Sequence, residues 1–183
     1  MTKTSSSLFR ICTFILPILF LITMSCKEAK SDNPLDPSNR SANVEELYKG
    51  YYQNPTTLDE KQQNQIIDHI IDNDLDMIRL ESGMYMMLTQ RGIGPNLEWG
   101  EEVIVHYRGT YLDGREFDSS YSRGKPFKTA VGSAITGWNE ALRRMKSGTK
   151  VIVILPSRLA YGSQEYAGIP PNSILKFEMH VLI

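Results

Sequence analysis

One carboxylate in this sequence stands in an unusual setting. Asp118 lies between Phe117 and Ser119 in an apolar block, and an unpaired charge is costly to bury. Such a group needs either an ion-pair partner or a functional role. Arg123, five residues further along, is a suitable partner for a purely structural pair. Asp118 is therefore a candidate functional residue, with a structural ion pair as the alternative interpretation.

The other residue types that often carry chemistry are scattered. The three histidines are isolated, with no cysteine or carboxylate cluster at ligand spacing, so no metal site and no cofactor is predicted. His106 and His180 fall within strand-like alternation, which favours structural or solvent-facing positions. Without Lys3 and Arg10, which precede Cys26, the chain has 18 basic residues against 21 acidic ones, a net charge of about −3. This balance argues against nucleic acid as a partner.

The strongest signal is an ordered series of short blocks in the C-terminal half of the chain. The blocks are VIVHYRG at 103–109, LDGREFDSS at 112–120, RGKPF at 123–127, ITGW at 135–138, LAYG at 159–162, IPPN at 169–172 and ILKF at 174–177. Their order resembles the FK506-binding-protein (FKBP) family of peptidyl-prolyl cis/trans isomerases. The resemblance implies an α+β fold, in which a curved antiparallel β-sheet wraps around one short helix.

The resemblance also implies a site. It assigns catalytic roles to Tyr107, Asp118 and Tyr161. Asp118 would act electrostatically and by orienting groups, without proton transfer, and Tyr161 would donate a hydrogen bond to a substrate carbonyl. The substrate-binding residues that it implies are Phe117, Phe127, Ile135, Trp138, Ile169 and Phe177. For each aromatic residue, the alternative is plain packing in the core.

Three details of the implied site concern single residues. Trp138 would form the floor of the pocket, and the backbone N–H of Ile135 would be a second donor. Ile169 begins a rigid loop tip with two prolines and would close over a ligand. Thr129 stands where the family commonly has a second Phe, and Ala134 where a Val is usual. We expect activity to survive these departures, with FK506-like macrolides acting as weak inhibitors.

The N-terminus reads as a targeting segment. Lys3 and Arg10 precede an apolar run over 11–24, which is shorter than the ~20 residues that span a bilayer and suits a signal peptide. The sequence predicts a signal peptide over 1–25, a lipidated Cys26 and a disordered tether over 26–41. Cys26 would be the only thiol of the mature chain, and acylation explains it. Ordinary secretion, with Cys26 incidental, is the alternative.

Residues 42–82 read as a helical extension. Thr57 and Glu60 form a capping-box pattern, and Gly83 suits a C-terminal stop. An apolar stripe at helical spacing follows the cap: Ile66, Ile67, Ile70, Ile71, Leu75 and Ile78. The stripe either packs on its own domain or forms the seam of a homodimer. An FKBP-type isomerase domain is predicted over 83–183.

Within that domain the apolar period changes to two, which indicates strands. Three sets of residues are each expected to share one strand face: Val103, Val105 and Tyr107; Val151, Val153 and Leu155; Leu175, Phe177, Met179 and Val181. The helical pattern in this domain lies over 137–146. Segments 137–142 and 155–162 look most similar to the bacterial macrophage-infectivity-potentiator type, and the leader resembles that of FKBP-like lipoproteins associated with gliding motility.

These features predict a membrane-anchored prolyl isomerase of the bacterial cell envelope, at the outer membrane or the periplasmic face. Its substrates would be Xaa–Pro segments of exported proteins. Two rivals remain on the same fold. One is a non-catalytic chaperone, which would be expected to lose Asp118, Tyr161 or Trp138. The other is an accessory lipoprotein of an envelope machine of the gliding type, with the apolar helix as its docking face.

Overall fold

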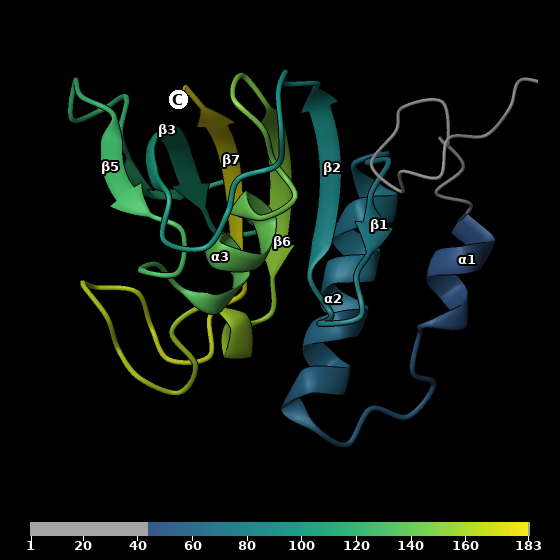
Figure 1. Cartoon of the computed structure of the whole chain (residues 1–183). Coiled ribbons are helices and arrows are strands. Elements are labelled where there is room, and N and C mark those ends of the chain that lie inside the picture. The colour runs from purple at the N-terminus through teal and green to yellow at the C-terminus, as the bar shows by residue number, and fades with distance from the viewer. Residues whose placement is uncertain (1–43, 183) are drawn as a thin grey trace, which may run out of the picture.

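A computed structural model of the chain describes residues 44–182 (Figure 1). The predicted signal peptide, Cys26 and the tether lie outside the described residues. Within residues 44–182, no helix is both long enough and apolar enough to cross a membrane.

The described chain is mainly β-structure with helices at two places. Two helices come first, α1 (Val44–Lys49) and α2 (Leu58–Asp72). The strands are β1 (Ile78–Arg79), β2 (Tyr85–Gln90), β3 (Glu102–Thr110), β4 (Glu116–Ser119), β5 (Phe127–Ala130), β6 (Lys150–Leu155) and β7 (Leu175–Val181). A third helix, α3 (Thr136–Leu142), separates β5 from β6, and a short 3₁₀ helix, η2 (Ser157–Leu159), follows β6.

All strands belong to one antiparallel sheet. The order along the sheet is β1-β2-β6-β7-β3-β4. Strand β5 pairs with the edge of β3 that faces away from β7. Because β3 carries both β4 and β5, one end of the sheet divides into two short arms. The register shifts between Gly109 and Thr110, where β3 pairs with β4, and a bulge of this kind bends a strand. The predicted α+β fold, a curved antiparallel sheet around one short helix, is confirmed.

The main core lies between the sheet and α3 (Figure 1). The three predicted strand faces all point into it, because alternate residues of a strand share a face. Helix α3 contributes its buried face at Trp138, Ala141 and Leu142. Gly137 allows this close approach, since a Cβ there would lie 2.4 Å from the side chain of Leu155.

The opposite face of the sheet is covered by α2. Ile66, Ile67 and Ile70 are at most 1% exposed and pack in a second cluster with Tyr85 and Ile154 of the sheet. The apolar stripe therefore packs on its own chain, as the first of the two alternatives predicted. These three isoleucines are covered and cannot serve as a dimer seam or as the docking face of an accessory subunit.

The start of α2 is as predicted, but its end is not. Thr57 and Glu60 form the reciprocal capping box. The helix ends at Asp72, capped by Asn73, and Asp74 takes a positive φ of 50° that turns the chain away. Leu75 and Ile78 lie beyond the helix. The chain folds back there, so that Leu75 packs against the cluster under α2 and Ile78, in β1, packs against the main core. The predicted stop at Gly83 is wrong, since this glycine (φ 89°) lies in the β1–β2 turn.

Candidate active site

A cavity of about 620 Å³ opens at the divided end of the sheet beside α3. Its lining residues are Tyr107, Phe117, Asp118, Arg123, Phe127, Ser133, Ala134, Ile135, Trp138, Tyr161, Tyr166 and Phe177. Apart from Ile169, every residue that the sequence implicated in catalysis or substrate binding lines it. The structure thus gathers these residues around one hollow, while their individual roles remain predictions.

Aromatic side chains form the bottom of the cavity. Trp138, in the first turn of α3, is only 4% exposed. Its ring meets the ring of Tyr107 edge-on at 4.9 Å and that of Phe177 at 5.4 Å. Edge-on pairs at these distances are the arrangement that aromatic rings favour. Trp138 therefore lies where the sequence placed the floor.

The cavity wall next to Trp138 requires a glycine on β3. Gly109 of β3 pairs with Phe177 of β7. A Cβ at Gly109 would lie 2.6 Å from the ring of Phe117 and 3.1 Å from that of Phe177. Only glycine therefore leaves room for both rings, which pack edge-on 5.6 Å apart. The glycine of the VIVHYRG block is explained by this packing.

A polar triangle lies at one side of the aromatic cavity. The Tyr107 hydroxyl donates a hydrogen bond to Asp118, and the Arg123 guanidinium forms an ion pair with the same carboxylate. Arg123 Nη2 also donates to the Tyr107 hydroxyl at 2.9 Å. The carboxylate is about 40% exposed, so the pair borders solvent. The predicted partnership of Asp118 and Arg123 is present, and it leaves Asp118 charged, oriented and open to the cavity.

Tyr161 lies on another side of the cavity, in the loop after η2. Its ring stacks on that of Tyr166, with centroids 4.2 Å apart and planes inclined by 9°. Burial, and then the neighbouring Tyr166, raise the pKa of the Tyr161 hydroxyl above its ordinary value of 10.0. The hydroxyl therefore stays protonated at neutral pH, and among the described residues it has no hydrogen-bond partner. It is a donor ready for a ligand.

The loop before α3 supplies the remaining edge. Asn139 holds this loop through its side chain, which accepts hydrogen bonds from the N–H groups of Gly132 and Ala134 and donates to the Ala134 carbonyl. Ile135 follows at the N-cap of α3 and is half-buried against the main core. Within residues 44–182 its backbone N–H has no hydrogen-bond partner, and its role as a donor to a substrate stays a prediction.

Three residues sit differently from what the sequence suggested. Ile169 does not line the cavity; it is 4% exposed and belongs to the main core. Its backbone pairs with Tyr166, and this pairing turns the isoleucine inward. Tyr166 does line the cavity and was missed, because one aromatic in a short polar loop carries no periodic signal. Thr129 is not among the lining residues, although Phe127 is.

Comparison with known proteins agrees with this geometry. A family model described as FKBP-type peptidyl-prolyl cis-trans isomerase matches residues 94–182. The crystal structure of AtFKBP13 is similar with a TM-score of 0.55 and 31% identity, covering 58% of this chain and 97% of that one. The crystal structure of FkpA from Escherichia coli has a TM-score of 0.62 and 30% identity, covering 76% and 62%. The chain belongs to the FKBP-type peptidyl-prolyl cis-trans isomerase family.

Sequence relatives add the bacterial context. FkpA of Escherichia coli strain K12 is 40% identical over 101 residues, which are 55% of this chain and 37% of that protein. The isomerase Mip of Coxiella burnetii is 40% identical over 104 residues, 56% of this chain and 45% of that protein. The chain thus spans about two fifths of the length of these curated relatives.

Proposed function

We propose that this protein catalyses cis/trans isomerisation of Xaa–Pro bonds. The observation that carries the proposal is the aromatic cavity with the Tyr107–Asp118–Arg123 triangle at its side. Rotation about the bond faces a barrier of ~18–20 kcal/mol because amide resonance is lost at the twisted midpoint. No bond breaks, so a site needs only to bind the twisted amide better than the planar one.

Each part of the cavity has a role in that preference. The rings of Trp138, Phe177 and Phe127 offer an apolar surface for the proline, and a twisted amide tolerates desolvation better than a planar one. The hydroxyl of Tyr161 and the N–H of Ile135 donate to the carbonyls that flank the proline. Asp118, held by its two partners, supplies a fixed charge beside the twisting amide. Preorganised groups of this kind lower a barrier without reorganising during the reaction.

The decisive experiment is a protease-coupled isomerase assay on the chain without its leader, using Xaa–Pro tetrapeptides. Isomerisation should be faster with the protein than without it, and an FK506-like macrolide at high concentration should compete as a weak inhibitor. Trp138→Leu, which removes the cavity floor, serves as the impaired variant. A folded protein with no acceleration at micromolar concentration would refute the proposed activity.

The cellular setting is proposed from the sequence alone. We infer that Cys26 is lipidated and anchors the domain in a bacterial envelope membrane, where it acts on Xaa–Pro segments of exported proteins. The support is the apolar run over 11–24 that ends at Ser25 and Cys26. Metabolic labelling with a fatty-acid analogue tests this: wild type should be labelled and membrane-bound. A Cys26→Ala variant that remains labelled and membrane-bound would contradict it.

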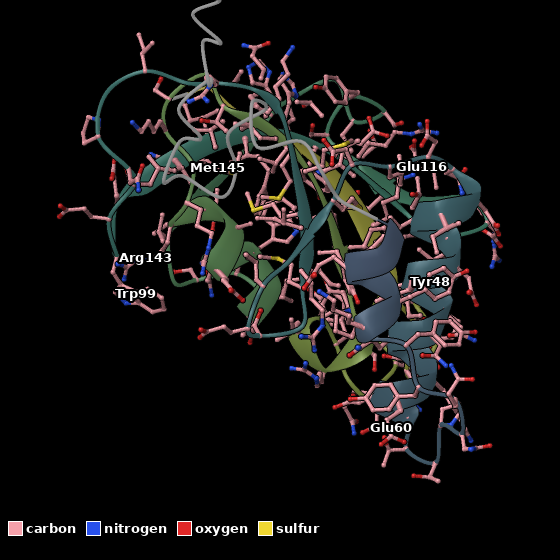
Figure 2. The ribbon with its side chains drawn as sticks, turned by 90° about the vertical axis from the view of Figure 1, so that its right-hand side faces the viewer. Tyr48, Glu60, Trp99, Glu116, Arg143 and Met145 are labelled. Carbon is pink, nitrogen blue, oxygen red and sulfur yellow. The ribbon has the colours of Figure 1, made fainter. Side chains whose placement is uncertain are left out.

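A homodimer through residues 42–82 would have to use a surface other than the buried stripe. Tyr48 and Tyr52 are 52% and 41% exposed, and Figure 2 labels Tyr48 beside α1. Light scattering on wild type and on Tyr48→Ser decides whether these tyrosines support self-association. A monomer in both cases would remove the dimer from the proposal.

A further inference from the structure

A buried glutamine joins α2 to the loop that carries Tyr161. Gln62 lies on the same helical face as Ile66 and Ile70, and its side chain is only 2% exposed. Its Oε1 accepts a hydrogen bond from the N–H of Ser157 at 2.8 Å, and its Nε2 donates to the carbonyl of Asn172 at 2.7 Å. Ser157 and Asn172 are the two ends of one loop, so a single side chain spans the loop's base.

These contacts belong to a closed ring of hydrogen bonds. The N–H of Gly162 donates to the Ser157 carbonyl at 2.8 Å, and the N–H of Asn172 donates to the Gly162 carbonyl at 2.7 Å. The ring thus runs from Gln62 to Ser157, Gly162, Asn172 and back to Gln62. Gly162 lies opposite Gln62 and directly follows Tyr161. The position of the cavity's tyrosine is therefore tied to a side chain of the N-terminal extension.

Two members of the ring have a left-handed backbone. Gly162 and Asn172 have positive φ values of 62° and 60°, a region that glycine and asparagine enter more readily than other residues. A second contact between the same elements, the ion pair of Asp59 with Arg158 at 3.0 Å, is about half exposed. Exposed pairs contribute little, whereas a buried amide left without partners is costly. Gln62 is therefore the stronger link.

We propose that Gln62 is a positioning residue of the isomerase site, which holds the loop from Ser157 to Asn172 so that Tyr161 faces the cavity. This inference rests on the proposed isomerase function. It gives α2 a part in the site itself, beyond tethering the domain or covering the sheet. Small displacements of positioned catalytic groups lower reaction rates by large factors. Loss of the Gln62 hydrogen bonds should therefore lower kcat/KM.

The test compares three variants of the full mature chain. Gln62→Met keeps the length of the side chain and removes both hydrogen bonds. Gln62→Asn is milder, since it keeps the amide and shortens its reach by one methylene. Gln65→Met changes an exposed residue of the same helix and is the matched control. For each, kcat and KM are measured on an Xaa–Pro peptide at a temperature where thermal unfolding shows a folded protein.

A structural role alone would lower stability and leave the kinetics of the folded protein unchanged. A positioning role predicts that kcat/KM falls about 10-fold in Gln62→Met, less in Gln62→Asn, and not in Gln65→Met. It also predicts coupling: added to Tyr161→Phe, Gln62→Met should cause little further loss, because both act on the same donor. An unchanged kcat/KM in a folded Gln62 variant would overturn the proposal. So would a loss of kcat/KM in the double variant equal to the product of the two single-variant losses.

Hydrogen exchange separates this inference from the activity on which it rests. The amides of Gly162 and Asn172 should exchange faster in Gln62→Met and at the wild-type rate in Gln65→Met. If wild type proves inactive, the isomerase proposal fails, and these two amides still decide whether Gln62 closes the ring. Equal exchange rates of these two amides in Gln62→Met and wild type would overturn the proposal that Gln62 holds the loop, even if the enzyme is active. If Gln62→Met does not fold, Gln62→Asn provides the same comparison.

Discussion

The Tyr107 hydroxyl donates a hydrogen bond to the Asp118 carboxylate at the side of a largely aromatic cavity. Arg123 contacts both groups and closes the triangle. Because the carboxylate already has a cationic partner and a hydroxyl donor, it stays charged and fixed in place. This arrangement suits an orienting electrostatic group and explains why a carboxylate is tolerated between Phe117 and Ser119.

Replacing Asp118 with Leu should lower kcat/KM by roughly 10- to 150-fold, since one interaction worth ~1.4–3 kcal/mol at the transition state is lost. Folding should be largely retained, because the carboxylate is about 40% exposed. Asp113→Leu, at an exposed turn of the same block, is the control. The measurement is kcat/KM on a tetrapeptide; a wild-type value for Asp118→Leu would remove this residue from the site.

Tyr161 allows its hydroxyl and its ring to be tested separately. Tyr161→Phe keeps the stack on Tyr166 and removes only the donor, so we expect a loss of about 10-fold in kcat/KM for one hydrogen bond. Tyr161→Ala loses the stack as well and should be slower still. Tyr121→Phe, at an exposed tyrosine stacked on His106, should change nothing. Equal rates for Tyr161→Phe and wild type would mean that the hydroxyl does not reach the substrate.

The helical extension is expected to matter for folding. Removing residues 42–82 would expose Tyr85 and Ile154 of the sheet, which are at most 1% exposed. Ile67→Ala should lower the free energy of unfolding by about 2–5 kcal/mol, the usual cost of truncating a buried Ile. Leu58→Ala, at a residue 46% exposed, is the control. Urea denaturation gives both values, and similar small losses would show that α2 is only loosely docked.

Periodic patterns predicted the strand faces well. The alternation at Val151, Val153 and Leu155 places all three in the main core. The residues between them, Ile152 and Ile154, are also apolar, and a strand that is apolar on both sides is typically covered on both faces. That run already carried the signal for a second layer over the sheet, and α2 provides it.

Features without a period could not be found this way. Leu75 and Ile78 continue the helical spacing although Asn73 has already ended α2. Both are apolar because Leu75 packs in the cluster under α2 and Ile78 packs on the main core. Gln62 shows the same limit: its partners, Ser157 and Asn172, are 95 and 110 residues away. No local pattern reports contacts between such distant segments. The order of the motifs predicted which residues line the cavity, whereas the hydrogen bonds of Gln62 that hold its loop are visible only in the tertiary structure.

Acid should destabilise the fold through His69. Burial, and then the charge of Lys176, lower the pKa of His69 below its ordinary 6.5, with Asp72 acting in the opposite direction. In the unfolded chain His69 binds a proton at a higher pH than in the folded one. Its contribution to stability is therefore complete above pH 6.5 and is lost as the pH falls through the folded pKa.

The test for His69 is the free energy of unfolding measured between about pH 7.5 and 5.0, a range that includes the ordinary histidine pKa of about 6.5. Stability should fall on the acid side in wild type and fall less steeply in His69→Gln. The pKa of His180 is lowered as well, by burial and by Lys150 and His106, so His69→Gln should keep part of the slope. Identical slopes for the two proteins would contradict the role of His69.

The last prediction concerns the cavity wall at Thr129. In β5, Phe127 pairs with Val105 and Thr129 with Val103, so both side chains are on the sheet face that carries the main core. Only Phe127 reaches the cavity, and Thr129 lies two residues further along the strand. A phenyl ring at Thr129 would extend the wall beyond Phe127, where a large ligand reaches and a short peptide does not.

Thr129→Phe should therefore bind an FK506-like macrolide more tightly than wild type. Full burial of a Phe side chain is worth ~1.5–3 kcal/mol, and a ligand would cover part of it. A gain of about 1 kcal/mol, roughly five-fold in Kd, is expected from that share. Catalysis on a tetrapeptide should hardly change, because so short a substrate occupies only the part of the cavity around Trp138. Lys128→Phe adds the same ring to the neighbouring exposed position, which points to the other face of the strand, and is the control. Calorimetric titration of the three proteins decides the matter: equal Kd values for Thr129→Phe and wild type would mean that the macrolide stops short of this part of β5.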